Sequence, residues 1–261
     1  MTRSQRRHKN NWRYTVQTRR RFIGMLVCAA TLCVAARPAA AGKYKAGEVT
    51  DGGTIVGVVN WDGPIPKPST LKVTGPDAPC HVKPIENEEI VVSDDAKVRW
   101  VVAYIKKIDH GKAFSDDATG PVVLDQHGCQ FSPHVVVVPK GRPLRVLNSD
   151  GILHNVHLYA KKNEPFNRSM PGGMKKLDVT FDYTERIHVA CDIHRWMSSW
   201  IVVSKHPYYA VTGADGAFRF DDVPAGTYTV EIWHEKLGKQ RAEVTVTAGG
   251  QASVEFRLKL K

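Results

Sequence analysis

Short runs of alternating or β-branched residues recur through most of this sequence, and they constrain its fold more than any other feature. Examples are GTIVGVVNW (53–61), HVVVVP (134–139), HNVHLYA (154–160), WIVVSK (200–205) and TYTVEIWH (227–234). Glycine, proline, asparagine and aspartate separate the runs, and helical periodicity is nearly absent beyond the N-terminal region. Many short strands between turn residues are typical of a β-sandwich or barrel. We therefore expect an all-β fold.

The first 41 residues have a different character. The stretch TRRRFIG (18–24) carries paired arginines before an apolar run, and RPAAAG (37–42) offers a cleavage site after Ala41. A basic region, a short apolar region and a small-residue end indicate a secretory signal peptide over residues 1–41. The paired arginines favour the twin-arginine export route and a periplasmic location. An uncleaved anchor is the alternative, but the apolar run is shorter than the roughly 20 residues that cross a bilayer. We expect no transmembrane segment in the mature chain.

This segment also carries most of the net charge. The formal charge of the whole chain is +11, and residues 1–41 contain nine cations and no acid. About +2 therefore remains on the mature chain, so the basic character belongs to the targeting signal and implies no nucleic-acid surface. The remaining length of about 220 residues suits two small domains or one large β domain.

Three of the five cysteines lie beyond the expected signal peptide, namely Cys80, Cys129 and Cys191. An odd count in an exported protein indicates one disulfide and one cysteine with a different role. Cys80 and Cys129 both lie in loop-like sequence, and the periplasm is oxidising, so we expect a disulfide between them. Cys191 would then be the cysteine that is left over.

A second metal site is the alternative for this region. His81, His127 and His134 lie close in sequence to Cys80 and Cys129, and zinc sites combine cysteine with histidine. The spacings match no zinc motif, so the disulfide is the preferred interpretation.

The stretch CDIHRWM (191–197) places three metal-capable side chains together. Cys191, His194 and Met197 are spaced C-x2-H-x2-M, and His154 in LHNVH (153–157) opens an expected strand upstream. A blue-copper site uses two histidines, one cysteine and a weak axial methionine. The alternatives are that Cys191 is a buried structural cysteine or a disulfide partner, and that Met197 only fills the core.

Asn155, next to His154, fits a supporting role in such a site. Its backbone N–H can donate to the ligand sulfur, and its side chain can tie the two ligand loops together.

The same segments resemble the cupredoxins, the amicyanin- and plastocyanin-like blue copper proteins. The resemblance covers about residues 120–204 and is carried by PHVVVVPKGRPLRVLN (133–148), LHNVH, VTF (179–181) and CDIHRWM. It implies an eight-stranded Greek-key sandwich and one type 1 copper that cycles between Cu(I) and Cu(II). The ligands it implies are His154, Cys191, His194 and Met197.

The resemblance also implies a partner surface. The second ligand histidine, His194, should lie near the surface with Trp196 or Trp200 as an apolar contact. Many members have proline after that histidine, whereas this chain has Arg195 followed by Trp196.

The C-terminal segment resembles the carboxypeptidase regulatory-like, transthyretin-like sandwich. The resemblance is carried by TGADGAFRF (212–220) and VPAGTYTV (223–230), and GTIVGVV (53–59) fits the opening strand of that module. We expect residues 52–108 and 206–261 to close one discontinuous sandwich around the inserted cupredoxin region. Residues 52–108 could instead belong to the cupredoxin sandwich. The resemblance to the carboxypeptidase regulatory-like family implies no catalytic residues.

The local patterns give three further expectations. PKGRP (139–143) resembles a hairpin turn with a left-handed Gly141, and residues 161–176 have the composition of a loop. Met170 and Met174 in that loop could offer thioethers to Cu(I), although a plain loop is preferred. His157, His206 and His234 are interpreted as ordinary histidines outside the ligand set.

These observations predict an electron carrier that exchanges electrons with protein partners such as a cytochrome or a dehydrogenase. The alternative is a periplasmic copper-binding chaperone or sensor without electron-transfer turnover. The sequence has no nucleophile elbow, no P-loop and no H-E-x-x-H, so we expect no enzyme activity.

Overall fold

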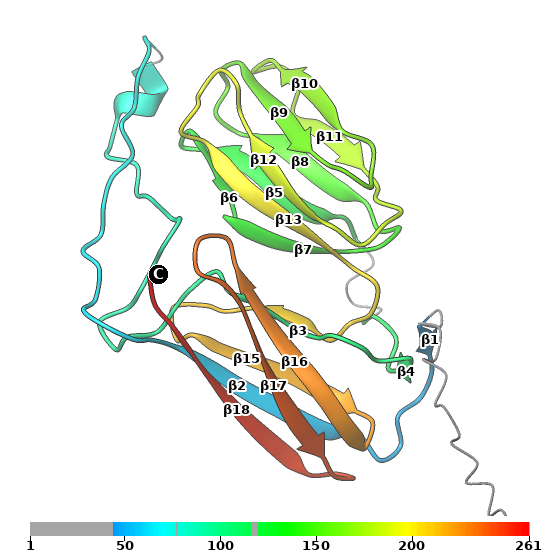
Figure 1. The fold of residues 1–261 in the computed structure, drawn as a ribbon. Coiled ribbons are helices and arrows are strands. Elements are labelled where there is room, and N and C mark those ends of the chain that lie inside the picture. Colours follow the sequence, from blue (N-terminus) through cyan, green and yellow to red (C-terminus); the bar gives the residue numbers. More distant parts are fainter. Residues whose placement is uncertain (1–43, 77, 116–119, 261) are drawn as a thin grey trace, which may run out of the picture. The chain divides into compact units, whose positions relative to one another are not determined.

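The structure is a computed structural model that describes residues 44–76, 78–115 and 120–260 (Figure 1). The signal peptide expected over residues 1–41 lies outside the described residues. Within the described ranges the chain forms β-strands and a single 3-10 turn, η1 (Ala78–His81). The expected all-β fold class is confirmed. No helix in these ranges is long and apolar enough to cross a membrane.

The middle of the chain forms what we call the first sandwich. One sheet has the strand order β10-β9-β12-β13-β7, and the other has the order β11-β8-β5-β6. Neighbours are antiparallel except β13 with β7 and β5 with β8, which are parallel. The strands are β5 (Val122–His127), β6 (Gln130–Ser132), β7 (Val135–Pro139), β8 (Leu144–Asn148), β9 (His154–Tyr159), β10 (Phe166–Met170), β11 (Lys176–Val179), β12 (Arg186–Ala190) and β13 (Ser198–Ser204).

Alternation along these strands buries one face of each sheet. Leu144 and Val146 on β8 and Ile187 and Val189 on β12 are fully buried, and they belong to one apolar cluster that spans both sheets. Period-2 alternation places such residues on one side of a strand, so the two inner faces meet in a common core. Cys191 and Met197 belong to the same cluster.

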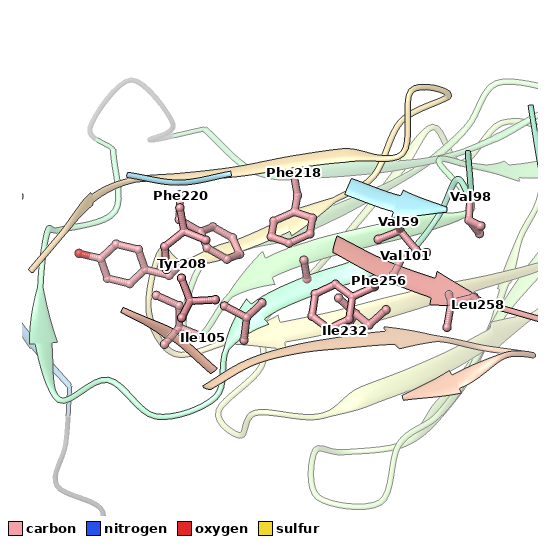
Figure 2. Packing of buried hydrophobic residues seen from close by; sticks show 14 of the residues in the cluster. Val59, Val98, Val101, Ile105, Tyr208, Phe218, Phe220, Ile232, Phe256 and Leu258 are labelled. Carbon is pink, nitrogen blue, oxygen red and sulfur yellow. The ribbon is translucent and has the colours of Figure 1, made fainter. Parts of the chain in front are cut away.

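The remaining strands form the second sandwich. Its sheets have the orders β14-β3-β16-β17 and β15-β2-β18. Side chains from both sheets, among them Ile105, Phe218, Ile232 and Phe256, pack together between them (Figure 2). The strands are β2 (Gly53–Trp61), β3 (Val102–Ile105), β14 (Tyr209–Val211), β15 (Ala217–Val223), β16 (Gly226–His234), β17 (Gly238–Val246) and β18 (Gln251–Leu258).

The second sandwich is discontinuous in sequence. Strand β2 pairs with β15 and β18, and β3 pairs with β14 and β16, so residues from both ends of the chain share its sheets. The strands of the first sandwich lie between β3 and β14 in the sequence. Two short strands, β1 (Lys45–Ala46) and β4 (His110–Gly111), pair in parallel and form a separate small sheet.

Two local expectations were wrong. The segment 139–143 does not join a hairpin, because β7 and β8 belong to different sheets and pair in parallel with β13 and β5. Gly141 does adopt the predicted left-handed conformation, with φ of +79°. The expected loop over 161–176 contains β10, which pairs along its length with β9. Strand β10 is a polar edge strand, so it lacks the apolar alternation that reveals a strand in the sequence.

Candidate metal centre

Neighbouring strands bring the predicted ligands together. His154 is the first residue of β9, and Cys191 directly follows β12, which pairs with β9 through Ala190 and His157. The segment 191–197 then forms the connection between β12 and β13, where Ala190 pairs with Ser198. The C-x2-H-x2-M motif is therefore the loop of a hairpin whose first strand lies beside His154.

Backbone hydrogen bonds close this loop. The N–H of Cys191 donates to the carbonyl of Met197 (3.3 Å), and the N–H of Met197 donates to the carbonyl of His194 (2.8 Å). Cys191, His194 and Met197 are each 1% exposed, and His154 is 0% exposed. All four predicted ligands therefore lie inside the protein.

The donor atoms face a common point. Nδ1 of His154 lies 2.9 Å from Nδ1 of His194, and that Nδ1 lies 3.8 Å from Sγ of Cys191. One donor atom from each of these three residues lies within 4.8 Å of the others. Two imidazole nitrogens and a sulfur that converge in this way form a candidate site for a metal ion that accepts soft and borderline ligands.

The side chain of Asn155 ties the two ligand segments together. Its backbone N–H lies 3.5 Å from Sγ of Cys191, and its side-chain oxygen accepts the N–H groups of Asp192 (2.6 Å) and Ile193 (3.3 Å). Its amide also donates to Asn167 on β10 (2.6 Å). Asn155 is 4% exposed, so its hydrogen bonds fix the hairpin loop to the start of β9.

Hydrogen bonds lower the pKa of the Cys191 thiol. Burial alone would raise the pKa of this thiol, but hydrogen bonds from His154 and from the backbone N–H groups of Asn155 and His194 outweigh burial and lower it. Thiolate is the form that binds metals. The surroundings of Cys191 therefore favour the ligand form of the side chain.

A carboxylate lies on the far side of His154. Burial opposes a positive charge on this ring, but the hydrogen bond to Asp150 and the nearby Cys191 sulfur outweigh it and raise the pKa of His154 to about 9. Burial would raise the pKa of Asp150, whereas hydrogen bonds from His154 and from the N–H groups of Cys129 and Gly128 lower it. The sequence analysis did not identify Asp150 as part of the site. Only its position four residues before His154 could have indicated it.

The donor set fits copper. It combines one thiolate, two imidazoles and a buried thioether, Met197, which belongs to the same apolar cluster as Cys191. Thiolate and thioether suit Cu(I), and imidazole suits both oxidation states. The N–H groups directed at the sulfur are the kind of outer contact that orients a ligand and tunes the metal.

The expected partner surface is supported only in part. The side chain of His194 is 1% exposed, although its chain neighbours Ile193 and Arg195 are exposed. Trp196 does lie beside it, with ring centroids 5.1 Å apart, and its indole N–H donates to the carbonyl of Cys129 (3.1 Å). Trp200 is directed elsewhere. Its indole N–H donates to Glu235 (3.0 Å), and its ring packs near His188.

The structure contains the predicted disulfide. Cys80 and Cys129 are bonded and both are buried, and Cys191 is the free cysteine of the described chain. The disulfide occupies the two sulfurs that the alternative metal site required.

The histidines of that alternative site do not come together. His81 contacts the carbonyl of Gly75 (2.9 Å), His127 lies 3.9 Å from Asp150, and His134 bonds to Glu235. No group of potential ligands among the residues with assigned positions joins these three histidines.

The other candidate donors make different contacts. Nδ1 of His157 lies 3.0 Å from an oxygen of Asp192. Met170 is fully buried and pairs with His154 across β10 and β9, but its sulfur accepts a hydrogen bond from Gln126 (3.2 Å). Met174 is partly buried against the first-sandwich core.

The fold and this cluster define a β-protein of two sandwiches with a candidate metal centre. Residues 201–259 match the family model of the carboxypeptidase regulatory-like domain, as the C-terminal motifs predicted. No curated protein matches the chain.

Parts of the chain are similar to several solved structures. They include a copper-containing nitrite reductase from Thermus scotoductus (23% identity, TM-score 0.30), which covers 32% of this chain, while the chain spans 22% of the reductase. A purple cupredoxin from Nitrosopumilus maritimus (17% identity, TM-score 0.28) covers 32% of this chain, and 99% of that protein is covered. A mutant of amicyanin in its Cu(I) form (21% identity, TM-score 0.30) covers 39% of this chain, and 98% of amicyanin is covered.

Proposed function

We propose that this protein binds one copper ion in a type 1 site and carries electrons between redox partner proteins in the periplasm. One observation carries the proposal: the donor atoms of His154, Cys191 and His194 converge within 4.8 Å of one another in a buried hairpin loop. Met197 from the same loop would supply a thioether as the fourth ligand. Copper bound by these four side chains would supply a one-electron couple between Cu(I) and Cu(II).

The chain contributes a fixed geometry. The backbone hydrogen bonds of the 191–197 loop and the contacts of Asn155 hold the donors in place without a metal. Burial of all four side chains excludes water from them. A site held in this way rearranges little when the metal charge changes, and small rearrangement is what an electron carrier needs.

Export and partners complete the proposal. The N-terminal signal would send the protein to the periplasm by the twin-arginine route, and a cytochrome or a dehydrogenase would exchange electrons with it. The second sandwich would have a structural role, and the protein would not be an enzyme.

Copper loading tests the site. The oxidised, copper-loaded protein should show an intense thiolate-to-copper visible band that bleaches on reduction. Cys191→Ser should abolish the band, and Met197→Leu should shift it. Met174→Leu is the matched control, because Met174 is not one of the four proposed ligands, and it should leave the spectrum unchanged. A colourless copper-loaded wild-type protein would refute the type 1 assignment.

Voltammetry separates the carrier from a copper chaperone or sensor. A carrier should give reversible one-electron exchange and retain its copper in the presence of a metal-free acceptor protein. Slow electron exchange together with transfer of copper to the acceptor would favour the chaperone.

A further inference from the structure

Asp150 lies directly behind one of the proposed copper ligands. Its Oδ2 is 2.9 Å from Nε2 of His154, and Nδ1 of the same ring faces His194. The side chain of Asp150 is 6% exposed and that of His154 is 0% exposed. The imidazole of His154 is therefore held between the donor cluster on one side and a buried carboxylate on the other.

A tight turn holds this carboxylate. The N–H of Gly128 donates to Oδ1 of Asp150 (2.5 Å), and the N–H of Cys129 donates to Oδ2 (2.8 Å). Both turn residues have left-handed backbones, with φ of +62° and +57°. They connect β5 to β6, where His127 pairs with Gln130. Successive residues of this conformation direct neighbouring N–H groups toward one anion.

The disulfide anchors the same turn. Cys129 is a non-glycine residue in the left-handed region, where such a conformation costs about 1–2 kcal/mol. Its sulfur is bonded to Cys80, and both cysteines are buried. The covalent bond therefore holds in place the residue whose N–H holds Asp150.

We propose that Asp150 is a positioning residue for His154, and that the turn anchored by the Cys80–Cys129 disulfide fixes Asp150. This inference rests on the proposed copper site. A proton held on Nε2 by a carboxylate leaves the lone pair of Nδ1 directed at the donor cluster. A buried negative charge beside the ligand also favours the more positive metal state, because charge interactions are strong where water is excluded.

Nuclear magnetic resonance of the ring nitrogens tests the hydrogen bond. In wild-type apo-protein and in the diamagnetic Cu(I) form, the Nε2–H of His154 should be shifted downfield and protected from exchange. A His154 ring without a proton on Nε2 in the wild type would overturn the proposal, whatever the variants do.

Asp150→Asn tests the charge. An amide has one acceptor oxygen for three donors, so the Nε2–H signal should move upfield and exchange faster. In the copper-loaded variant the reduction potential should rise and the visible band should shift. Asp178→Asn is the matched control, since it removes an exposed carboxylate paired with Arg145 on the same sandwich. A purely structural role would lower stability without a change in potential.

The double variant Cys80→Ser/Cys129→Ser tests the anchor. It keeps Asp150 but frees the turn, so the signal and the potential should move in the same directions as in Asp150→Asn, by less. Wild-type values in this variant would overturn the role of the disulfide.

The experiments distinguish a failure of the proposed copper site from a failure of the positioning role of Asp150. A blue wild-type protein whose ring signal and potential are unaffected by Asp150→Asn would overturn the positioning role alone. A wild-type protein without the visible band would overturn the proposed function, and the apo-protein resonance would still report on the ring.

Discussion

The backbone N–H of Asn155 points at Sγ of Cys191 from 3.5 Å, across the boundary between β9 and the 191–197 loop. The Asn155 side chain accepts the N–H of Asp192, the residue that follows Cys191. One residue therefore sets both the surroundings of the sulfur and the path of the loop that carries it.

Asn155→Ala should destabilise the protein and loosen the site. The change leaves the N–H groups of Asp192 and Ile193 without their acceptor, and the loss of a hydrogen bond of this kind costs about 0.5–1.5 kcal/mol. Urea unfolding of the apo-protein should show this loss. Asn60→Ala is the control, because its side chain contacts the side chains of Glu255 and Lys97 and no backbone N–H group, so its loss should cost less than that of Asn155. Equal effects of the two changes would contradict the role assigned to Asn155.

The ligand cluster could be predicted from the sequence because its information is local. The spacing of Cys191, His194 and Met197 and the strand start at His154 are visible in two short segments. Asp150 could not be predicted as their neighbour, because its place depends on left-handed residues at 128 and 129, more than twenty positions upstream in the chain.

The other features that the sequence did not reveal also depend on long-range packing. The burial of the His194 side chain depends on how the 191–197 loop folds back onto the core. The segment 139–143 looked like a hairpin because its two strands are adjacent in sequence, but parallel pairing with β5 and β13 separates them into different sheets.

Gly57→Ala should disrupt the core of the second sandwich. A Cβ at Gly57 on β2 would lie 2.0 Å from the ring of Phe218, its paired residue on β15. Phe218 is buried among the core side chains of Figure 2, so overpacking should cost about 1–3 kcal/mol in the free energy of unfolding.

A double-mutant cycle checks the cause. If the ring is the obstacle, Gly57→Ala should cost less in a Phe218→Leu background than in the wild type. Gly173→Ala is the control, because its Cβ would meet nothing within 4 Å. Additive effects at positions 57 and 218 would show that the ring is not the cause.

The disulfide should account for a large share of the stability. It joins residues separated by 49 positions, and closure of a loop of that length is worth about 4 kcal/mol in the chain-entropy estimate. Cys80→Ser/Cys129→Ser should lower the unfolding free energy by an amount of that order.

Thiol chemistry gives an independent check. Denatured wild-type apo-protein should contain one titratable thiol in the mature chain, that of Cys191, and peptide mapping should join Cys80 to Cys129. Three free thiols, or a bridge that includes Cys191, would contradict the assignment.

His206 should make the protein sensitive to mild acid. The side chain is fully buried among the rings of Tyr44, Tyr208 and Tyr209. Burial, with a smaller effect from Lys205, lowers the pKa of His206 to about 4. The unfolded chain, with a pKa of about 6.5, therefore binds a proton that the folded chain cannot accept.

The sign follows from this difference. As the pH falls from about 6.5 toward the folded pKa of His206, the unfolding free energy should decrease by about 3 kcal/mol on account of this group. His206→Leu removes the contribution, so the stability of the variant relative to the wild type should rise as the pH falls from 7.5 to 4.5 in urea unfolding of the apo-proteins. His234, whose pKa burial also lowers to about 4, is present in both proteins and cancels. His110→Leu, at an exposed position on β4, is the control. A difference between wild type and His206→Leu that does not change with pH would show that the buried ring accepts its proton in the folded state.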